Sequence, residues 1–137
     1  YQRSRGLGDV YKRQFLISSL LKDNIKEDKG CIINITDAMV IRGMKDYSIY
    51  STAKGGLETL TKSLARDLAP EITVNAVAPG AILLPSDGSS NEELLLSKIP
   101  LGRLGTEADI ASAVYYLSKN KYITGQILRV DGGRSLN

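Results

Sequence analysis

The 137-residue sequence predicts an α/β layered fold, in which crossover helices connect the strands of a parallel sheet. Helical and strand patterns alternate along the chain, in the order helix, strand, helix, strand, helix, strand. The strand patterns are short and continuously apolar, which is typical of parallel strands buried on both faces. Glycine or proline marks the ends of most segments. The pattern contains no internal repeat and indicates a single domain.

The first half of the predicted fold contains two helices and one strand. Residues 15–28 (FLISSLLKDNIKED) place apolar side chains at the spacing of a helix packed on one side. The run CIINI at 31–35 is rich in β-branched residues and predicts a buried strand. Residues 47–68 predict a long amphipathic helix, which Pro70 brings to an end.

The second half begins with a buried strand at 72–79 (ITVNAVAP), which ends in the Pro79-Gly80 turn. Residues 81–105 are less regular, with turn residues at 86–90 and a short helical patch at 91–98. This stretch fits either a flexible loop over a ligand or a plain surface excursion.

A capping signal marks the last helix. Thr106 is the expected N-cap and Asp109 stands three residues later, so a helix should run from there to about Ser118. After a turn at Gly125, QILRVDGG at 126–133 predicts a final strand.

The net charge of +3 and the isoelectric point near 9.0 raise the question of nucleic-acid binding. Residues 1–14 carry four basic residues and one acidic residue, out of 18 and 15 in the whole chain. Residues 15–137 therefore carry 14 of each and are formally neutral. The 1–14 segment lacks periodicity and resembles an artefactual end found on translated environmental fragments, so we interpret it as a non-native leader. A basic arm is the alternative; we expect no nucleic-acid partner.

Composition also argues against disulfide, metal and membrane classes. The single cysteine, Cys31, excludes an internal disulfide and a cysteine metal cluster, and we expect no metal site. This cysteine usage predicts a reducing, cytoplasmic setting. No apolar run reaches membrane-spanning length, so we expect no membrane partner.

Three residues are candidates for proton chemistry. Tyr50 and Lys54 are four apart, so on a helix the ammonium lies beside the phenol. A neighbouring positive charge should lower the pKa of Tyr50 and make it a usable acid or base. Asp37 follows the strand at 31–35 directly and adds a carboxylate.

The predicted topology brings these residues toward one crevice. Ligands of open α/β sheets bind beyond the carboxyl ends of the strands, where Asp37 and the Pro79-Gly80 turn both lie. Tyr50 and Lys54 could project into the same crevice. Taken singly, each feature also has an ordinary explanation, as a chance pair on a helix or as a cap residue.

The motifs together resemble a known family. YSIYSTAKGGLETLTKSLARDLAPEITVNAVAPGAI closely resembles the catalytic half of the short-chain dehydrogenase/reductase family, and the resemblance extends from about residue 15 to the end. Tyr-x-x-x-Lys, V-N-A-V-x-P-G, R-L-G-T-x-x-D-I-A and T-G-Q-x-x-x-V-D-G-G occur in the family's order. The resemblance implies a Rossmann-like sheet and an oxidoreductase that acts on a small-molecule substrate.

Residue roles follow from this resemblance by position. It implies that Tyr50 is the proton donor or acceptor, and that Lys54 binds the nicotinamide ribose and lowers the tyrosine pKa. It places the contact with the nicotinamide carboxamide at Pro79, Gly80 and Ile82. The implied cofactor is NADPH, with NADH left open, and the implied assembly is a homo-oligomer, a tetramer or dimer, with the 47–68 helix in a subunit interface.

Asp37 departs from the usual family pattern, which has a catalytic serine at this place. A carboxylate here resembles the pteridine reductase branch, as do the V-A-P-G-A-I-L stretch and the Gly-Arg-Ser-Leu ending. In that branch the aspartate binds the tyrosine and helps to protonate a pterin nitrogen. The resemblance therefore favours an NADPH-dependent reductase of dihydropterin or dihydrofolate-like rings. The alternatives are a 3-oxoacyl-thioester or other carbonyl reductase, and an inactive fragment or non-catalytic relic.

The resemblance covers only the later part of the family's domain. A Gly-rich first turn and an active-site asparagine belong upstream of the matched region. We therefore expect residues 15–137 to be the C-terminal catalytic portion of one domain, truncated at its N-terminal half, and the 137-residue chain alone to be inactive and poorly folded.

Overall fold

The computed structural model describes residues 12, 14–20, 30–82 and 91–137. Residues 14–20 are helical, which confirms the first part of the predicted helix at 15–28. The remainder of that helix, the predicted turn at 86–90 and most of the 1–14 segment lie outside the described residues.

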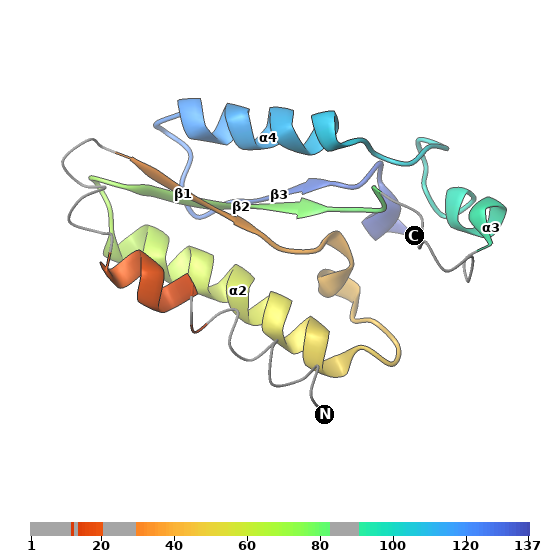
Figure 1. Cartoon of the computed structure of the whole chain (residues 1–137), viewed down its shortest axis with the longest axis horizontal. Helices are drawn as coiled ribbons and strands as arrows, with labels where there is room; N and C mark the ends of the chain where they lie inside the picture. The colour runs from red at the N-terminus through yellow and green to blue at the C-terminus, as the bar shows by residue number, and fades with distance from the viewer. Residues whose placement is uncertain (1–11, 13, 21–29, 83–90) are drawn as a thin grey trace.

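The described strands form one parallel sheet. β1 (Cys31–Ile35), β2 (Thr73–Pro79) and β3 (Ile127–Val130) lie in the order β1-β2-β3, and both neighbouring pairs are parallel. Figure 1 shows helix α2 (Ser48–Asp67) on one face of the sheet and helix α4 (Glu107–Lys119) on the other. The predicted α/β fold with a parallel sheet is confirmed.

Helix α2 packs on the sheet through a stripe of small and apolar side chains. Its buried residues recur every three or four positions, which is the period of one helix face: Ala53, Leu57, Thr61, Leu64 and Ala65. The C-terminal part of this stripe joins residues of the first two strands and the loop before β2 in one core cluster: Ile32, Leu64, Ala65, Leu68, Ile72 and Val74. This contact fixes the direction in which α2 approaches the sheet.

Helix α4 begins with the predicted capping box. The Thr106 hydroxyl accepts from the Asp109 backbone N–H at 3.2 Å, and Oδ2 of Asp109 accepts from the Thr106 backbone N–H at 2.8 Å. Ala113 and Leu117 of its buried face pack with Val77 of β2. The helix therefore covers the face of the sheet opposite α2.

The end of the chain differs from the prediction. The predicted strand at 126–133 ends at Val130, because the Asp131 carboxylate accepts from the backbone N–H groups of Gly133, at 3.0 Å, and Ser135, at 2.8 Å. These bonds turn the chain into a 3₁₀ helix, η2 (Arg134–Leu136). Gly133, with φ of +85°, supplies the left-handed conformation that the turn requires.

The predicted helical patch at 91–98 is shorter in the structure. Helix α3 covers Glu92–Leu96, and the Asn91 side chain caps it by accepting from the Leu94 backbone N–H at 3.2 Å. Ile99, just beyond this helix, is buried against Gly132 and so connects this segment to the end of β3.

Candidate active site

Asp37 and Tyr50 meet at the carboxyl end of β1. The Tyr50 hydroxyl donates a 2.8 Å hydrogen bond to Oδ2 of Asp37, across 13 residues of sequence. The Thr36 backbone N–H donates to the carbonyl of Val77 at 2.9 Å, so the sheet ladder continues one residue past β1. This extension holds Asp37 at the sheet edge where α2 presents Tyr50.

The carboxylate of Asp37 is shared between two donors. Oδ1 accepts from the Met39 backbone N–H at 2.8 Å and thereby caps η1 (Ala38–Arg42), a 3₁₀ helix that the sequence analysis does not predict. Oδ2 accepts from Tyr50. The cap interpretation and the chemical interpretation of Asp37 are therefore both consistent with its contacts.

Lys54 lies one turn after Tyr50, but its ammonium contacts the main chain. Nζ donates to the carbonyl oxygen of Ile35 at 3.0 Å. Because Ile35 is the last residue of β1, this bond ties α2 to the strand end that carries Asp37. An ammonium has three N–H donors, so two remain that can meet ligand oxygens.

The pKa of Tyr50 differs from the expectation. Burial raises the pKa of this phenol above its ordinary value, and the hydrogen bond to Asp37 and the negative charge of Asp37 raise it further. The expectation that Lys54 lowers the pKa is wrong for this arrangement, because the carboxylate contacts the phenol directly whereas the ammonium bonds to Ile35. Tyr50 is therefore protonated at neutral pH and can act as a proton donor.

The turn formed by Pro79, Gly80 and Ile82 lies at the same edge of the sheet. Ile35 pairs with Val77 in the parallel register, so Asp37 and Pro79 each stand two residues beyond this pair. The Gly80 backbone N–H donates to the carbonyl of Val130 at 2.9 Å. The turn thus stands between the Asp37–Tyr50 pair and the end of β3, and within the described residues no hydrogen bond joins it to Tyr50.

Glu58 is a residue that the sequence analysis missed. It accepts a 3.4 Å hydrogen bond from the Thr36 hydroxyl, and its other oxygen lies 3.6 Å from Nη2 of Arg129 on β3. Glu58 stands four residues after Lys54, which itself stands four after Tyr50, so the same helix spacing could have found it. Its contacts hold β1, β3 and α2 together just below the site.

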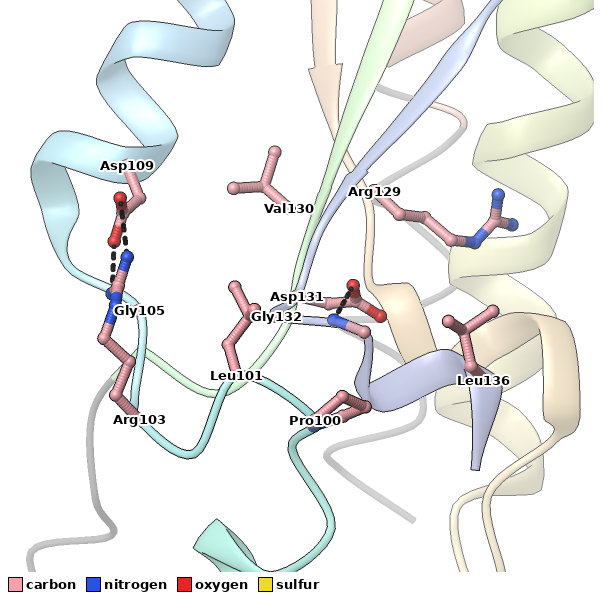
Figure 2. Close-up of a pocket in the computed structure, with 11 residues that line it drawn as sticks. Pro100, Leu101, Arg103, Gly105, Asp109, Arg129, Val130, Asp131, Gly132 and Leu136 are labelled. Carbon is pink, nitrogen blue, oxygen red and sulfur yellow. Dashed lines mark hydrogen bonds and ion pairs between the residues drawn. The ribbon is translucent and has the colours of Figure 1, made fainter.

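A hollow of about 480 Å³ opens at the carboxyl end of β3, and the sequence analysis did not predict it. Figure 2 shows Leu101, Val130 and Gly132 around it, with Arg103 directed toward Asp109. The guanidinium of Arg103 lies 2.9 Å from Asp109, and this contact together with the bonds from Thr106 lowers the pKa of Asp109 to about 2. Both residues of this pair line the hollow.

A second hollow, of about 400 Å³, lies beside η1. We call it the basic hollow, because three of its lining residues are cationic: Met39, Arg42, Gly43, Lys98, Arg134 and Asn137. The hollow is not predictable from the sequence, since its residues come from three separate segments. Met39 belongs both to its wall and to the cap that Asp37 forms.

Among the helices of the described residues, none is long and apolar enough to cross a membrane. The described part of the chain also contains no group of three or more metal-ligating side chains placed to hold an ion.

Known proteins of similar sequence cover most of this chain. A family profile described as enoyl-(acyl carrier protein) reductase matches residues 13–135. The 3-oxoacyl-[acyl-carrier-protein] reductase of Bos taurus is 43% identical over 117 residues, which are 85% of this chain and 49% of that protein. Carbonyl reductase family member 4 of Danio rerio is 43% identical over 114 residues, 82% of this chain and 48% of that protein.

Solved structures of similar fold also match this chain. The apo form of a SCOR enzyme from Clostridium thermocellum superposes with a TM-score of 0.89 at 34% identity, covering all of this chain and 55% of that one. ElxO with NADP bound superposes with a TM-score of 0.80 at 29% identity, covering 90% of this chain and 54% of that one.

The relatives also bear on the substrate expected from the sequence. The named relatives are 3-oxoacyl-thioester and carbonyl reductases, so the comparisons support the alternative function better than the pteridine reductase branch. The chain spans about half the length of the curated relatives it matches. The family profile matches residues 13–135, and the order of the motifs and the parallel sheet point to the same family. The chain belongs to the short-chain dehydrogenase/reductase family.

Proposed function

We propose that the complete protein is an NADPH-dependent oxidoreductase that reduces the carbonyl group of a small-molecule substrate, with a 3-oxoacyl thioester as the leading class. The observation that carries this proposal is the protonated Tyr50 hydroxyl, held by Asp37 at the carboxyl edge of the sheet. The named 3-oxoacyl and carbonyl reductase relatives support the substrate class.

Tyr50 would donate its proton to the substrate oxygen as that oxygen gains negative charge. Its raised pKa keeps the proton in place until a stronger acceptor forms. Asp37 holds the hydroxyl oriented at the strand end before the substrate binds. The hydroxyl then rotates from the carboxylate to the reacting oxygen.

The donor groups present fit a nicotinamide cofactor. Two N–H groups of Lys54 remain for the ribose hydroxyls, and its bond to Ile35 fixes the ammonium beside Tyr50. Pro79, Gly80 and Ile82 would line the nicotinamide side of the crevice. The cofactor would supply the hydride. NADPH is favoured because the ElxO neighbour binds NADP, and NADH is the alternative.

A pterin or folate-like ring is the second candidate substrate, and one contact favours it. Tyr50 is held by a carboxylate rather than by a neutral hydroxyl. A carboxyl group can take up a proton from solvent and pass it through Tyr50 to a ring nitrogen, which needs a full proton. This relay is the chemical advantage that Asp37 would offer over serine.

One assay separates the two substrates. The full-length protein is incubated with NADPH and either acetoacetyl-coenzyme A or dihydrobiopterin, and loss of NADPH absorbance is followed. Turnover of the thioester alone removes the pterin candidate, and turnover of dihydrobiopterin alone removes the thioester. Turnover of neither, with either nicotinamide cofactor, contradicts the proposed function.

We also propose a cytoplasmic homo-oligomer in which α2 contributes to a subunit contact. Tyr47, the N-cap of this helix, and Ile49 in its first turn are 58% and 54% exposed, and a subunit contact would remove this apolar surface from water. The molar mass of the full-length protein from light scattering tests the assembly. A monomer at micromolar concentration would contradict it.

A further inference from the structure

We propose that the basic hollow binds an anionic group, a phosphate or a carboxylate, at the end of the substrate remote from the reacting bond. This inference rests on the proposed reductase function and specifies the substrate class further. The hollow brings together three cationic side chains, Arg42, Lys98 and Arg134.

Three separate segments build this hollow. Arg42 ends η1, Lys98 follows α3, and Arg134 begins η2. Helices η1 and η2 pack against each other. Asn137 adds a polar side chain whose amide donates to the carbonyl of Lys98 at 3.3 Å, which links the α3 segment to η2. The cations are thus held near one another by the fold rather than by chance overlap of mobile side chains.

The positive charges are not balanced by nearby carboxylates. None of the lining residues that the structure describes is acidic. Among the described residues, none of the three cations forms an ion pair with a carboxylate; Asp37 and Asp131 instead accept hydrogen bonds from Met39, Tyr50, Gly133 and Ser135. Three like charges that face one volume favour an anion in that volume.

One guanidinium also has an unmet hydrogen bond. Nε of Arg134 is buried and has no acceptor among the described residues. A buried N–H group without an acceptor is unfavourable, and a shift of the guanidinium toward an anionic ligand oxygen in the hollow would satisfy it. Guanidinium groups bind both carboxylates and phosphates through paired N–H donors, so the geometry suits either anion.

The hollow is connected to the reacting groups by one residue. Met39 lines it, and the Met39 backbone N–H donates to Asp37, which in turn accepts from Tyr50. A substrate whose anionic end occupies the hollow would have to extend past Met39 to reach the Tyr50 hydroxyl. The volume of about 400 Å³ is large enough for such a group and the atoms that lead away from it.

The test compares matched substrates on the full-length protein. Acetoacetyl-coenzyme A carries phosphates, whereas acetoacetyl-N-acetylcysteamine is a neutral thioester. Dihydrofolate carries carboxylates, whereas dihydrobiopterin has none. For whichever pair is turned over, the ratio of kcat/KM for the anionic member to that for the neutral member is measured. The thioester pair reports phosphate binding and the pterin pair reports carboxylate binding.

Arg42→Gln should lower this ratio roughly tenfold, the effect of losing one charge-assisted hydrogen bond. Arg66→Gln is the matched control, because Arg66 is also an exposed arginine in the last turn of a helix but stands on α2, outside the hollow. It should leave the ratio unchanged. A ratio that Arg42→Gln does not alter, or that both variants alter equally, overturns the inference.

A binding measurement separates this inference from the proposed function. If the full-length protein reduces none of the four compounds, the function fails, yet calorimetric titration with inorganic phosphate and with succinate still tests the hollow. Binding that Arg42→Gln weakens and Arg66→Gln preserves supports the anion site. Absence of binding for both anions removes it.

Discussion

The hydroxyl of Tyr50 donates a 2.8 Å hydrogen bond to Asp37, and this contact joins helix α2 to the end of strand β1. Burial and the carboxylate together raise the pKa of Tyr50 and so keep the phenol protonated well above neutral pH. The tyrosine is therefore a neutral acid that can donate its proton when a substrate acceptor binds. An ammonium-activated phenolate would instead act as a base at the start of the reaction.

Replacing Tyr50 with Phe should lower kcat of the full-length protein about a hundredfold or more, as expected for loss of a general acid. Substrate KM should change little, since the ring remains. Tyr47→Phe is the matched control, because Tyr47 lies next to Tyr50, with ring centroids 6.4 Å apart, and is exposed. Steady-state kinetics of the two variants check this, and similar losses in both would show that Tyr50 is not the donor.

Replacing Asp37 with Asn should lower the pKa of Tyr50, because it removes the negative charge that disfavours the phenolate. The alkaline limb of the rate profile should then move to lower pH. The carboxyl-mediated proton relay would also be lost, so reduction of a pterin should suffer more than reduction of a thioester. Asp37→Ser, which restores a neutral hydroxyl, should preserve thioester reduction. An alkaline limb that stays in place would contradict the coupling between the two side chains.

The same pair makes the stability depend on pH in a defined direction. The pKa of Tyr50 is higher in the folded protein than its ordinary value of about 10. Its contribution to stability is therefore fully present below about pH 10 and is lost as the pH rises through the folded-state pKa. The loss of stability between neutral and strongly alkaline pH should be smaller in Tyr50→Phe than in Tyr47→Phe, measured by urea unfolding of the full-length protein.

The capping box of α4 provides a test of local structure. Thr106→Ala removes the oxygen that accepts from the Asp109 backbone N–H and should lower the free energy of unfolding by about 1 kcal/mol. Ser112→Ala is a suitable control, since its hydroxyl only donates to the carbonyl of Ala108 within the same helix. The midpoints of urea unfolding of both variants check the difference. Equal midpoints would mean that the Thr106 cap does not contribute to the free energy of unfolding.

Local features of this fold were predictable from sequence, and contacts between distant segments were not. The capping box needs only the spacing of Thr106 and Asp109, and the Tyr50–Lys54 face needs only the helix period. The hydrogen-bond partner of the Lys54 ammonium depends on which carbonyl β1 presents to it. The helix period does not reveal this partner, and the sequence therefore predicted a lowered pKa for Tyr50 where the structure raises it. Periodicity carries no information on such placements.

The end of β3 and the basic hollow also depend on contacts that periodicity does not predict. Asp131 was assigned to a strand by its apolar neighbours, but its side-chain bonds to Gly133 and Ser135 end the ladder. Arg42 and Arg134 line one hollow because η1 and η2 pack together, and neither short helix has a periodic signature. Residues that assemble the basic hollow therefore become visible only in three dimensions.

Gly80 offers the sharpest test of how the turn formed by Pro79, Gly80 and Ile82 is positioned against the end of β3. A Cβ atom at Gly80 would lie 2.6 Å from the Cα of Asp131, a backbone atom that cannot move without displacing the end of β3. Gly80→Ala should therefore destabilise the full-length protein by about 1–3 kcal/mol, as for other overpacked sites, and should weaken nicotinamide cofactor binding.

Gly56→Ala is the matched control for this substitution. Its added Cβ meets nothing within 4 Å, and it lies inside α2, where alanine is favoured over glycine by about 1 kcal/mol. Thermal unfolding should thus shift in opposite directions for the two alanines, and cofactor titration should detect a loss for Gly80→Ala only. If Gly80→Ala were as stable as the parent and bound the cofactor equally well, the close approach of this turn to Asp131 could not be what positions it.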